Sequence, residues 1–191
     1  KAKKSKIFSK IVVSSDNKRI LNISKSNNVD YLIKRSKRLS LSSTPKIPVI
    51  RDALKKAEKK FLIKFDYIMD LDVSSPLRNV ADIKKSMKKI VREKKNILFS
   101  ENNAKKNPYF NVVEFNKGKF SIVKKKKPLF TRQSAPKVFE LNASIYIWKR
   151  KILLQKNTLF MKYNTIFKMP YSRSIDIDSI EDFRLVNYLM K

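Results

Sequence analysis

The sequence contains no cysteine and no histidine among its 191 residues. The absence of cysteine excludes disulfide bonds and thiol nucleophiles, and the absence of both excludes a zinc site built on Cys or His. A general base must therefore be a carboxylate, a lysine, a tyrosine or the substrate itself. Any metal ion must bind to carboxylates, which favours a hard cation such as Mg²⁺. The lack of cysteine also fits a reducing compartment.

Glycine is nearly absent as well, because Gly118 is the single glycine of the chain. Phosphate loops of the Walker and Rossmann types need several glycines at fixed spacing, so the sequence contains neither. No apolar run approaches the roughly 20 residues of a membrane span. The basic N-terminal residues 1–6 are not followed by the apolar segment of a signal peptide. The chain begins without methionine, and we expect it to be a fragment.

Acidic residues are scarce, since 16 Asp and Glu accompany 46 Lys and Arg, which gives a net charge of +30. Such a charge attracts polyanions, namely nucleic acid, anionic membranes or phosphorylated substrates. Composition alone favours an RNA-binding protein, and a ribosomal protein first. Aromatic residues between lysines over residues 115–130 fit that interpretation. The lysine run at 124–127 is explained equally well by a solvated loop.

Short apolar runs alternate along the chain with segments of helical periodicity. The runs predict strands at residues 11–13, 31–33, 67–71, 96–99, 143–148 and 165–169, and a hairpin over 110–123. The periodic segments predict helices at residues 20–23, 47–60 and 80–90, and after a near capping box at 179–182. This alternation predicts an α/β fold with a mainly parallel sheet. No repeat or linker divides the chain, so we expect one domain over residues 1–191.

Two acidic pairs fall where parallel sheets bind ligands, at the carboxyl ends of strands. Asp70 and Asp72 close the strand at 67–71, and Asp176 and Asp178 precede the last helix. Residues i and i+2 of an extended segment point the same way, so each pair can present two carboxylates to a cation. Simpler interpretations are that Asp178 caps the helix, Asp176 pairs with a basic residue and Asp70 bonds to backbone.

The segment DYIMDLDVSSPLR at residues 66–78 resembles the central motif of the acylneuraminate cytidylyltransferases, the CMP-sialic acid synthetase family. With an acidic residue at Asp72, the motif resembles the version found in the branch of the family that acts on bacterial nonulosonates such as legionaminic acid. Further segments match the family in order. They are IVVSSD at 11–16, TPK at 44–46, KNPYFN at 106–111, RQ at 132–133 with Pro136, NASIY at 142–146 and RSIDID at 173–178.

The resemblance implies a single Rossmann-like α/β domain of the nucleotide-diphospho-sugar transferase type. It also implies a sugar-side or dimerisation extension at residues 104–141 and a cytoplasmic homodimer that serves cell-surface polysaccharide biosynthesis. In the implied reaction, the anomeric hydroxyl of a 2-keto-3-deoxy acidic sugar attacks the α-phosphate of CTP, and pyrophosphate leaves. Mg²⁺ is the implied cofactor, because it neutralises developing phosphate charge with one or two protein carboxylates.

Roles for individual residues follow from the same resemblance. The implied catalytic residues are Asp176, Asp178 and Arg173, of which Asp176 and Asp178 bind the metal. The implied substrate-binding residues are Asp72, Ser74, Ser75, Arg78, Asn107, Tyr109, Phe110, Arg132, Gln133 and Asn142. The implied nucleotide-binding residues are Ser15, Asp16, Thr44 and Lys46. Simpler alternatives are that Tyr109 and Phe110 belong to a core or hairpin and that Arg132 is a surface residue.

The chain departs from the family at its start. The family opens with a strand and a Gly-, Arg- and Lys-containing loop that cradles the triphosphate, and nothing before Ile7 matches them. That strand would be central to the sheet. An inactive, truncated homologue is therefore the first alternative to an active enzyme, and an RNA-binding protein is the second. We expect no nucleic-acid partner, on the hypothesis that the lysine content reflects drift in an AT-rich gene.

Overall fold

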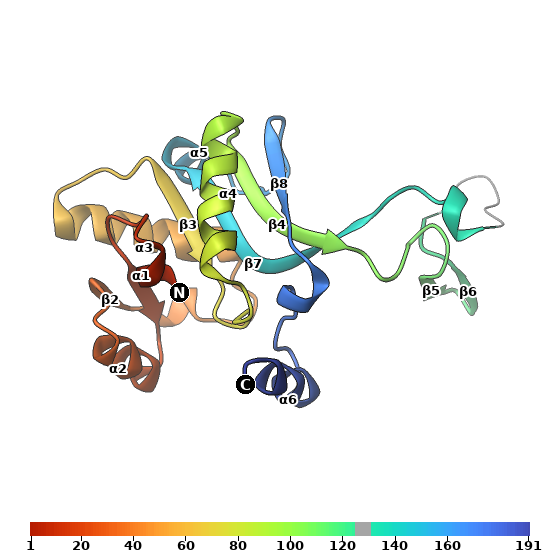
Figure 1. The fold of residues 1–191 in the computed structure, drawn as a ribbon, viewed down its shortest axis with the longest axis horizontal. Helices are drawn as coiled ribbons and strands as arrows, with labels where there is room; N and C mark the ends of the chain where they lie inside the picture. The colour runs from red at the N-terminus through yellow and green to blue at the C-terminus, as the bar shows by residue number, and fades with distance from the viewer. Residues whose placement is uncertain (125–130) are drawn as a thin grey trace.

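The computed structural model describes residues 1–124 and 131–191 (Figure 1), so most of the predicted loop at 124–127 lies outside the described residues. The strands are β1 (Val12–Ser15), β2 (Tyr31–Lys34), β3 (Tyr67–Leu71), β4 (Ile97–Asn103), β5 (Val113–Asn116), β6 (Lys119–Ile122), β7 (Phe139–Lys149) and β8 (Asn164–Lys168). The helices are α1 (Ala2–Ser5), α2 (Lys18–Ser26), α3 (Lys46–Phe61), α4 (Val80–Arg92), α5 (Arg150–Gln155) and α6 (Ile180–Leu189). Short 3-10 turns occur at Lys37–Leu39, Arg132–Ser134 and Tyr171–Arg173. Each predicted strand and helix is present, whereas α1 and α5 were not predicted.

The central sheet has four strands in the order β3-β7-β4-β8. Strands β3, β4 and β8 run in one direction, and β7 is antiparallel to both of its neighbours, β3 and β4. The α/β class is confirmed, and the sheet is mixed. The direction of β7 was not predicted, because the sequence of a strand buried on both faces is a continuous apolar run, and that run does not indicate whether the strand is parallel or antiparallel to its neighbours.

Helices cover both faces of this sheet (Figure 1) and define two hydrophobic clusters. The α3–α5 face has a core of Ile47, Leu54, Ile97, Phe99, Tyr146, Trp148 and Leu153. The α4 face has a core of Ile83, Ile90, Leu98, Ile145, Ile147 and Met169. Alternate residues of β4 and β7 therefore serve opposite faces, as the pleat of a strand requires.

Strands β1 and β2 form a separate parallel pair, which packs with α2 and α3. Within residues 1–124 and 131–191, no strand joins β1 to β3, so the pair and the central sheet remain distinct. Both strands of this pair contact α3, whose first residue is Lys46.

The segment 104–141, called the arm below, leaves the sheet between β4 and β7 and projects away from the body (Figure 1). Its described part contains the antiparallel hairpin β5–β6, which confirms the predicted hairpin. The two residues of its turn, Lys117 and Gly118, both have positive φ, at 48° and 78°. Such angles match the right-handed twist of a two-residue hairpin and explain why the single glycine lies here. Among the described residues, no helix is long and apolar enough to cross a membrane.

Candidate active site

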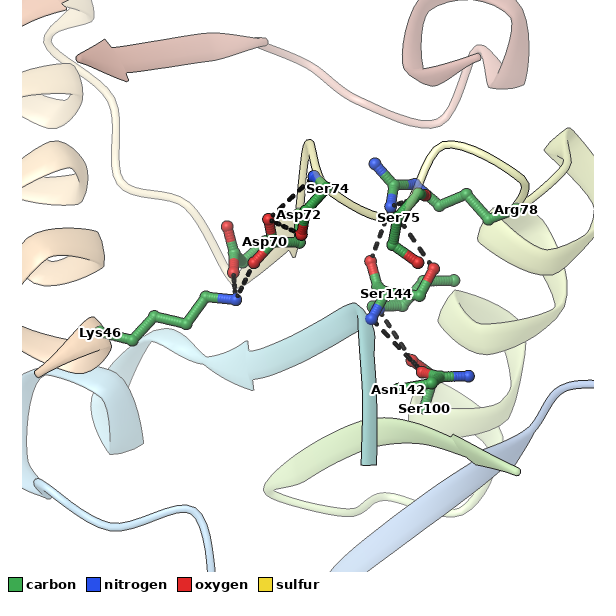
Figure 2. Close-up of polar contacts among 10 residues, drawn as sticks. Lys46, Asp70, Asp72, Ser74, Ser75, Arg78, Ser100, Asn142 and Ser144 are labelled. Atoms are coloured by element: carbon green, nitrogen blue, oxygen red, sulfur yellow. Dashed lines mark hydrogen bonds and ion pairs between the residues drawn. The ribbon is translucent and has the colours of Figure 1, made fainter. Parts of the chain in front are cut away.

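Two acidic residues at the end of β3 share one cation, the ammonium of Lys46 (Figure 2). The Lys46 Nζ atom lies 2.8 Å from Oδ2 of Asp70 and 2.8 Å from Oδ2 of Asp72. It also lies 4.6 Å from the ring centroid of Tyr146. Burial acts to lower the Lys46 pKa, but the two carboxylates raise it overall. Asp70 is therefore ion-paired, and the interpretation that it bonds to backbone is wrong.

The second oxygen of Asp72 organises the turn that follows β3. Asp72 Oδ1 accepts hydrogen bonds from the Ser74 backbone N at 3.2 Å and from Ser74 Oγ at 3.0 Å. Burial acts to raise the Asp72 pKa, but Lys46 and Ser74 lower it overall, so the carboxylate is ionised. Ser75 is fully buried, and its hydroxyl has no hydrogen-bond partner among the described residues. The turn thus has a fixed backbone, and it encloses one hydroxyl that has no hydrogen-bond partner among the described residues.

Arg78 lies behind this turn and is only 9% exposed. Its Nη1 atom donates to the backbone oxygens of Ser75 at 2.8 Å and Ser144 at 3.1 Å (Figure 2). Burial lowers the Arg78 pKa, and the carboxylates of Asp72, Asp70 and Asp176 oppose that effect. Arg78 therefore supplies a buried positive charge close to the acidic residues and holds β7 against the turn.

The C-terminal acidic pair is brought to the same turn. The backbone N of Ile177 donates to the Ser74 carbonyl oxygen at 2.9 Å, which places Asp176 beside the end of β3. Asp176 Oδ1 is buried and has no hydrogen-bond partner in the described part of the chain. Asp176 also forms no ion pair with a described Lys or Arg, so the simpler interpretation of this residue fails.

Asp178 is exposed and lies just before α6. The capping box of α6 consists of Ser179 and Asp182, as the sequence predicts. Asp178 contributes its backbone N, which donates to Asp182 Oδ2 at 3.3 Å, and its own carboxylate is not part of the cap. The side chain of Asp178 is therefore open to solvent, two residues from the buried oxygen of Asp176.

Arg173 anchors the C-terminal segment to α4. Its Nε and Nη2 atoms donate to the two oxygens of Asp82, each at 2.9 Å. Asp82 Oδ2 also accepts from the backbone N of Asn79 at 2.9 Å, which completes the capping box of α4. This pairing raises the Arg173 pKa. The family resemblance implies that Arg173 is catalytic, whereas in this structure its guanidinium group is hydrogen-bonded to Asp82.

A buried polar link connects the sheet to the same segment. Ser100 Oγ donates to Asn142 Oδ1 at 2.6 Å (Figure 2), and Asn142 Nδ2 donates to Ser174 Oγ at 2.9 Å. Asn142 is 4% exposed. Because both ends of its amide are bonded inside the protein, Asn142 joins β4, β7 and the C-terminal segment.

Comparison with known proteins identifies the family. No protein-family model matches the chain. The sequence is 42% identical over 191 residues to post-translational flagellin modification protein B of Campylobacter coli, which covers all of this chain and 80% of that relative. It is 41% identical over 190 residues to CMP-N,N'-diacetyllegionaminic acid synthase of Campylobacter jejuni, with 99% of this chain and 80% of that relative covered. The chain belongs to the acylneuraminate cytidylyltransferase family.

More distant comparisons agree with this family. A pseudaminic acid cytidylyltransferase of Campylobacter jejuni is 23% identical over 186 residues, which cover 97% of this chain and 79% of that relative. A solved CMP-2-keto-3-deoxy-manno-octonic acid synthetase with CTP has a TM-score of 0.61 at 14% identity, and covers 95% of this chain and 80% of its own. A 4-diphosphocytidyl-2C-methyl-D-erythritol synthase from Anaerococcus prevotii has a TM-score of 0.67 at 12% identity. The match covers 100% of this chain and 82% of that chain. These structures establish the shared α/β fold.

The cytidylyltransferase places nine of its ten predicted sugar-side residues in two groups, and the tenth, Asn142, is buried in β7 with hydrogen bonds to Ser100 and Ser174. Asp72, Ser74, Ser75 and Arg78 lie at the turn after β3, whereas a second group lies on the arm. The residues of the arm group are Asn107, Tyr109, Phe110, Arg132 and Gln133.

The arm group stabilises the arm itself. Asn107 Nδ2 donates to the Pro136 oxygen at 2.9 Å, and Asn107 Oδ1 accepts from the Tyr109 backbone N at 3.0 Å. Arg132 is exposed and donates to the Lys105 oxygen at 3.0 Å. Because the arm projects from the body (Figure 1), this group does not join the turn after β3 within one copy of the chain.

The predicted nucleotide-side residues of the enzyme lie near the ends of β1 and β2. Ser15 Oγ accepts from the Asn17 backbone N at 3.2 Å. Asp16 pairs with Arg35 at 3.2 Å, and the hydrogen bond from Arg35 lowers the Asp16 pKa. Thr44 Oγ1 donates to the Arg38 oxygen at 3.1 Å. Lys46, the fourth of these residues, lies at the acidic pair of β3 rather than beside Ser15 and Asp16.

Two acidic residues that are buried in the structure, Asp82 and Glu101, were not singled out from the sequence. Asp82 had a usable signal, since Asn79 three residues before it gives the spacing of a capping box. Glu101 is buried in β4, two residues beyond Phe99, and a carboxylate in line with the apolar residues of a strand could have drawn attention.

Proposed function

We propose that this cytidylyltransferase transfers CMP from CTP to an acidic nonulosonate sugar, with legionaminic and pseudaminic acids as the leading candidates, and releases pyrophosphate. The 41% identity to a CMP-N,N'-diacetyllegionaminic acid synthase supports the substrate class. The observation that carries the proposal is the docking of Ile177 on Ser74 at 2.9 Å, which gathers Asp176, Asp72 and Arg78 around one turn.

Magnesium fits the residues of this turn. Asp176 Oδ1 is a buried carboxylate oxygen that lacks a partner among the described residues, and a cation is the natural partner of such an atom. Asp178 is exposed two residues further on and offers a second oxygen ligand. Two protein carboxylates with phosphate oxygens form a usual Mg²⁺ site. When bound, Mg²⁺ neutralises phosphate charge as the phosphorus–oxygen bonds change.

In this proposal, the side chains of the protein bind and orient the substrate. Lys46 and Asp72 hold the Ser74 turn in place, and Arg78 adds a buried positive charge that favours an anionic substrate. One bond forms between the sugar oxygen and the α-phosphorus, and the bond from that phosphorus to the pyrophosphate oxygen breaks. The hydroxyl proton passes to a carboxylate or to water, since the chain has no histidine.

We also propose a homodimer in the cytoplasm, where CTP is available. The arm carries Asn107, Tyr109 and Arg132 away from the body, and its hairpin exposes Phe115 (65%) and Phe120 (72%). A second copy is the partner that would bring these residues to a turn after β3. Sedimentation of the wild type and of the double variant F115A/F120A tests this, and a wild-type monomer at micromolar concentration would refute it.

Pyrophosphate release with CTP, Mg²⁺ and a panel of nonulosonates tests the proposed reaction. We expect release with at least one N-acylated acid and no release without sugar. Binding of CTP or sugar without turnover would identify an inactive homologue. Salt-sensitive RNA binding in the nanomolar range, with no sugar binding, would revive the RNA-binding alternative.

A further inference from the structure

Strand β7 contains a bulge beside the acidic turn. Its register with β4 shifts between Phe99 and Glu101, so residues 142–145, called the β7 bulge below, lie opposite Ser100 alone. Within the bulge, Ala143 has a φ of 51°, a left-handed angle that strains any residue with a Cβ atom. Such strain persists only where the surroundings fix the backbone, and both strained residues and bulges are concentrated at functional sites. The β7 bulge is therefore a candidate positioning element.

Buried side chains hold the β7 bulge from inside. Ser100 Oγ accepts from the Ile145 backbone N at 2.8 Å and donates to Asn142 Oδ1 at 2.6 Å. Asn142 Oδ1 also accepts from the Ser144 backbone N at 3.3 Å. A backbone N–H can only donate, so this contact fixes which end of the Asn142 amide faces the strand. The Nδ2 atom must then face the C-terminal segment, where it donates to Ser174 Oγ at 2.9 Å.

The β7 bulge also contacts the turn after β3, so that the hydrogen bonds form a closed ring. Arg78 Nη1 donates to the Ser144 oxygen at 3.1 Å and to the Ser75 oxygen at 2.8 Å (Figure 2). The Ile177 backbone N donates to the Ser74 oxygen at 2.9 Å. The ring thus runs from the bulge through Arg78 to the turn, from the turn to Ile177, and back along the C-terminal segment to the bulge.

Asp176 lies in this ring between two anchors. Ser174 lies two residues before it, and Ile177 follows it directly. Ser174 is only 7% exposed and is held twice, because its Oγ accepts from Asn142 and donates to the Pro170 oxygen at 2.9 Å. Asp176 Oδ1 is buried and has no hydrogen-bond partner among the described residues. The two anchors, and not a contact of this oxygen, therefore determine where the oxygen lies.

The charges near Asp176 explain why it needs anchors. Burial raises the Tyr146 pKa and Lys46 opposes this, while three nearby carboxylates add to the rise, those of Asp70, Asp72 and Asp176. Three carboxylates close to one phenol are also close to one another, and like charges repel. A cation relieves this repulsion when it binds. Before it binds, the neutral hydrogen bonds of the two anchors hold the third carboxylate in place.

We propose that Ser174 is a positioning residue of the Mg²⁺ site, which is held by the β7 bulge and in turn holds Asp176 where the cation binds. This inference rests on the proposed function and adds to it a residue that contacts neither the metal nor the substrate. Partners behind the ligands of a metal site commonly change metal affinity by about ten- to a hundredfold. Loss of the Ser174 hydroxyl should therefore weaken Mg²⁺ binding although both carboxylates remain.

Calorimetric titration with Mg²⁺ tests the inference in two matched variants. Ser174→Ala and Ser86→Ala each remove one buried hydroxyl that donates to a backbone oxygen, but Ser86 lies in α4, outside the ring. We expect Ser174→Ala to bind Mg²⁺ about tenfold more weakly than the wild type. Ser86→Ala should bind it as the wild type does. Ser174→Thr keeps the hydroxyl and should retain most of the affinity.

The same substitution in the Asp176→Asn variant separates positioning from a general loss of structure. Ser174→Ala should have no further effect on Mg²⁺ affinity there, because the carboxylate that Ser174 positions is already gone. An equal tenfold loss in both backgrounds would overturn the inference. Unchanged Mg²⁺ affinity of Ser174→Ala would also overturn it and leave the proposed function standing. A wild type that binds no Mg²⁺ would overturn both.

Hydrogen exchange in the metal-free wild type gives a readout that does not depend on the folding of a variant. The Ile177 amide, which donates to the Ser74 oxygen, should be protected from exchange before Mg²⁺ is added, because the proposal requires an anchored segment. Exchange of this amide at the rate of an unstructured peptide would show that the segment is not held in advance and would overturn the inference.

Discussion

Loss of the Asp82 carboxylate is expected to destabilise the protein more than loss of an otherwise similar helix cap. Asp82 accepts two hydrogen bonds from Arg173 and one from the Asn79 backbone, and its side chain is 4% exposed. The capping bond contributes about 1 kcal/mol. The two charge-assisted bonds contribute about 2 kcal/mol together, because Arg173 can return to water when its partner is removed. We therefore expect Asp82→Ala to lower the free energy of unfolding by about 3 kcal/mol.

The chain offers a matched control for this measurement. Asp182 occupies the same position of a second capping box, that of α6, but has no arginine partner among the described residues. Asp182→Ala should therefore cost about 1 kcal/mol or less. Urea unfolding followed through Trp148, the single tryptophan and 1% exposed, reports on the core. Equal losses for the two variants would show that the Arg173 pair adds no stability and would refute the reasoning.

Three further predictions concern charge. The Glu93 pKa is lowered to about 2, first by the hydrogen bond from Lys89, so its stabilising effect should be full above its ordinary pKa of 4.5 and be lost as the pH falls through 2. Glu93→Gln should therefore lower the free energy of unfolding at pH 6 and change it much less at pH 2, and an equal loss at both pH values would contradict this. Lys46→Met should raise the Asp72 pKa from its wild-type value, measured by carbon-13 NMR, because the ammonium that lowers it is lost while the burial that raises it remains; an unchanged pKa would contradict this. Asp176→Asn should weaken Mg²⁺ binding in calorimetry at least tenfold, whereas the exposed Asp16→Asn should leave it unchanged.

The sequence predicted the elements of the fold because local patterns determine them. The apolar run at 67–71 became β3, and Ser179 with Asp182 formed the predicted capping box. The antiparallel direction of β7 depends on how distant segments meet, and no local pattern records it. Exposed turn residues such as Gly118 were likewise predictable, because their backbone angles depend on the residue itself.

The partners of the site residues were harder to predict than their positions. Lys46 is separated from Asp72 by 26 residues, and spacing alone cannot show that its ammonium reaches that carboxylate. Arg173 meets Asp82 across 91 residues. The RSIDID segment was recognised as acidic and ligand-like, but the contact of Ile177 with Ser74 that positions it arises only from the packing of the C-terminal segment on the turn.

Detection of the product tests the central claim most directly. The protein is incubated with CTP, Mg²⁺ and N,N'-diacetyllegionaminic acid, and the CMP-sugar is sought by mass spectrometry and phosphorus-31 NMR. We expect a phosphodiester product whose mass equals that of CMP plus sugar minus water, with pyrophosphate in equal amount. Asp176→Asn should abolish it. Absence of the CMP-sugar from the wild-type reaction with this acid and with pseudaminic acid would contradict the account.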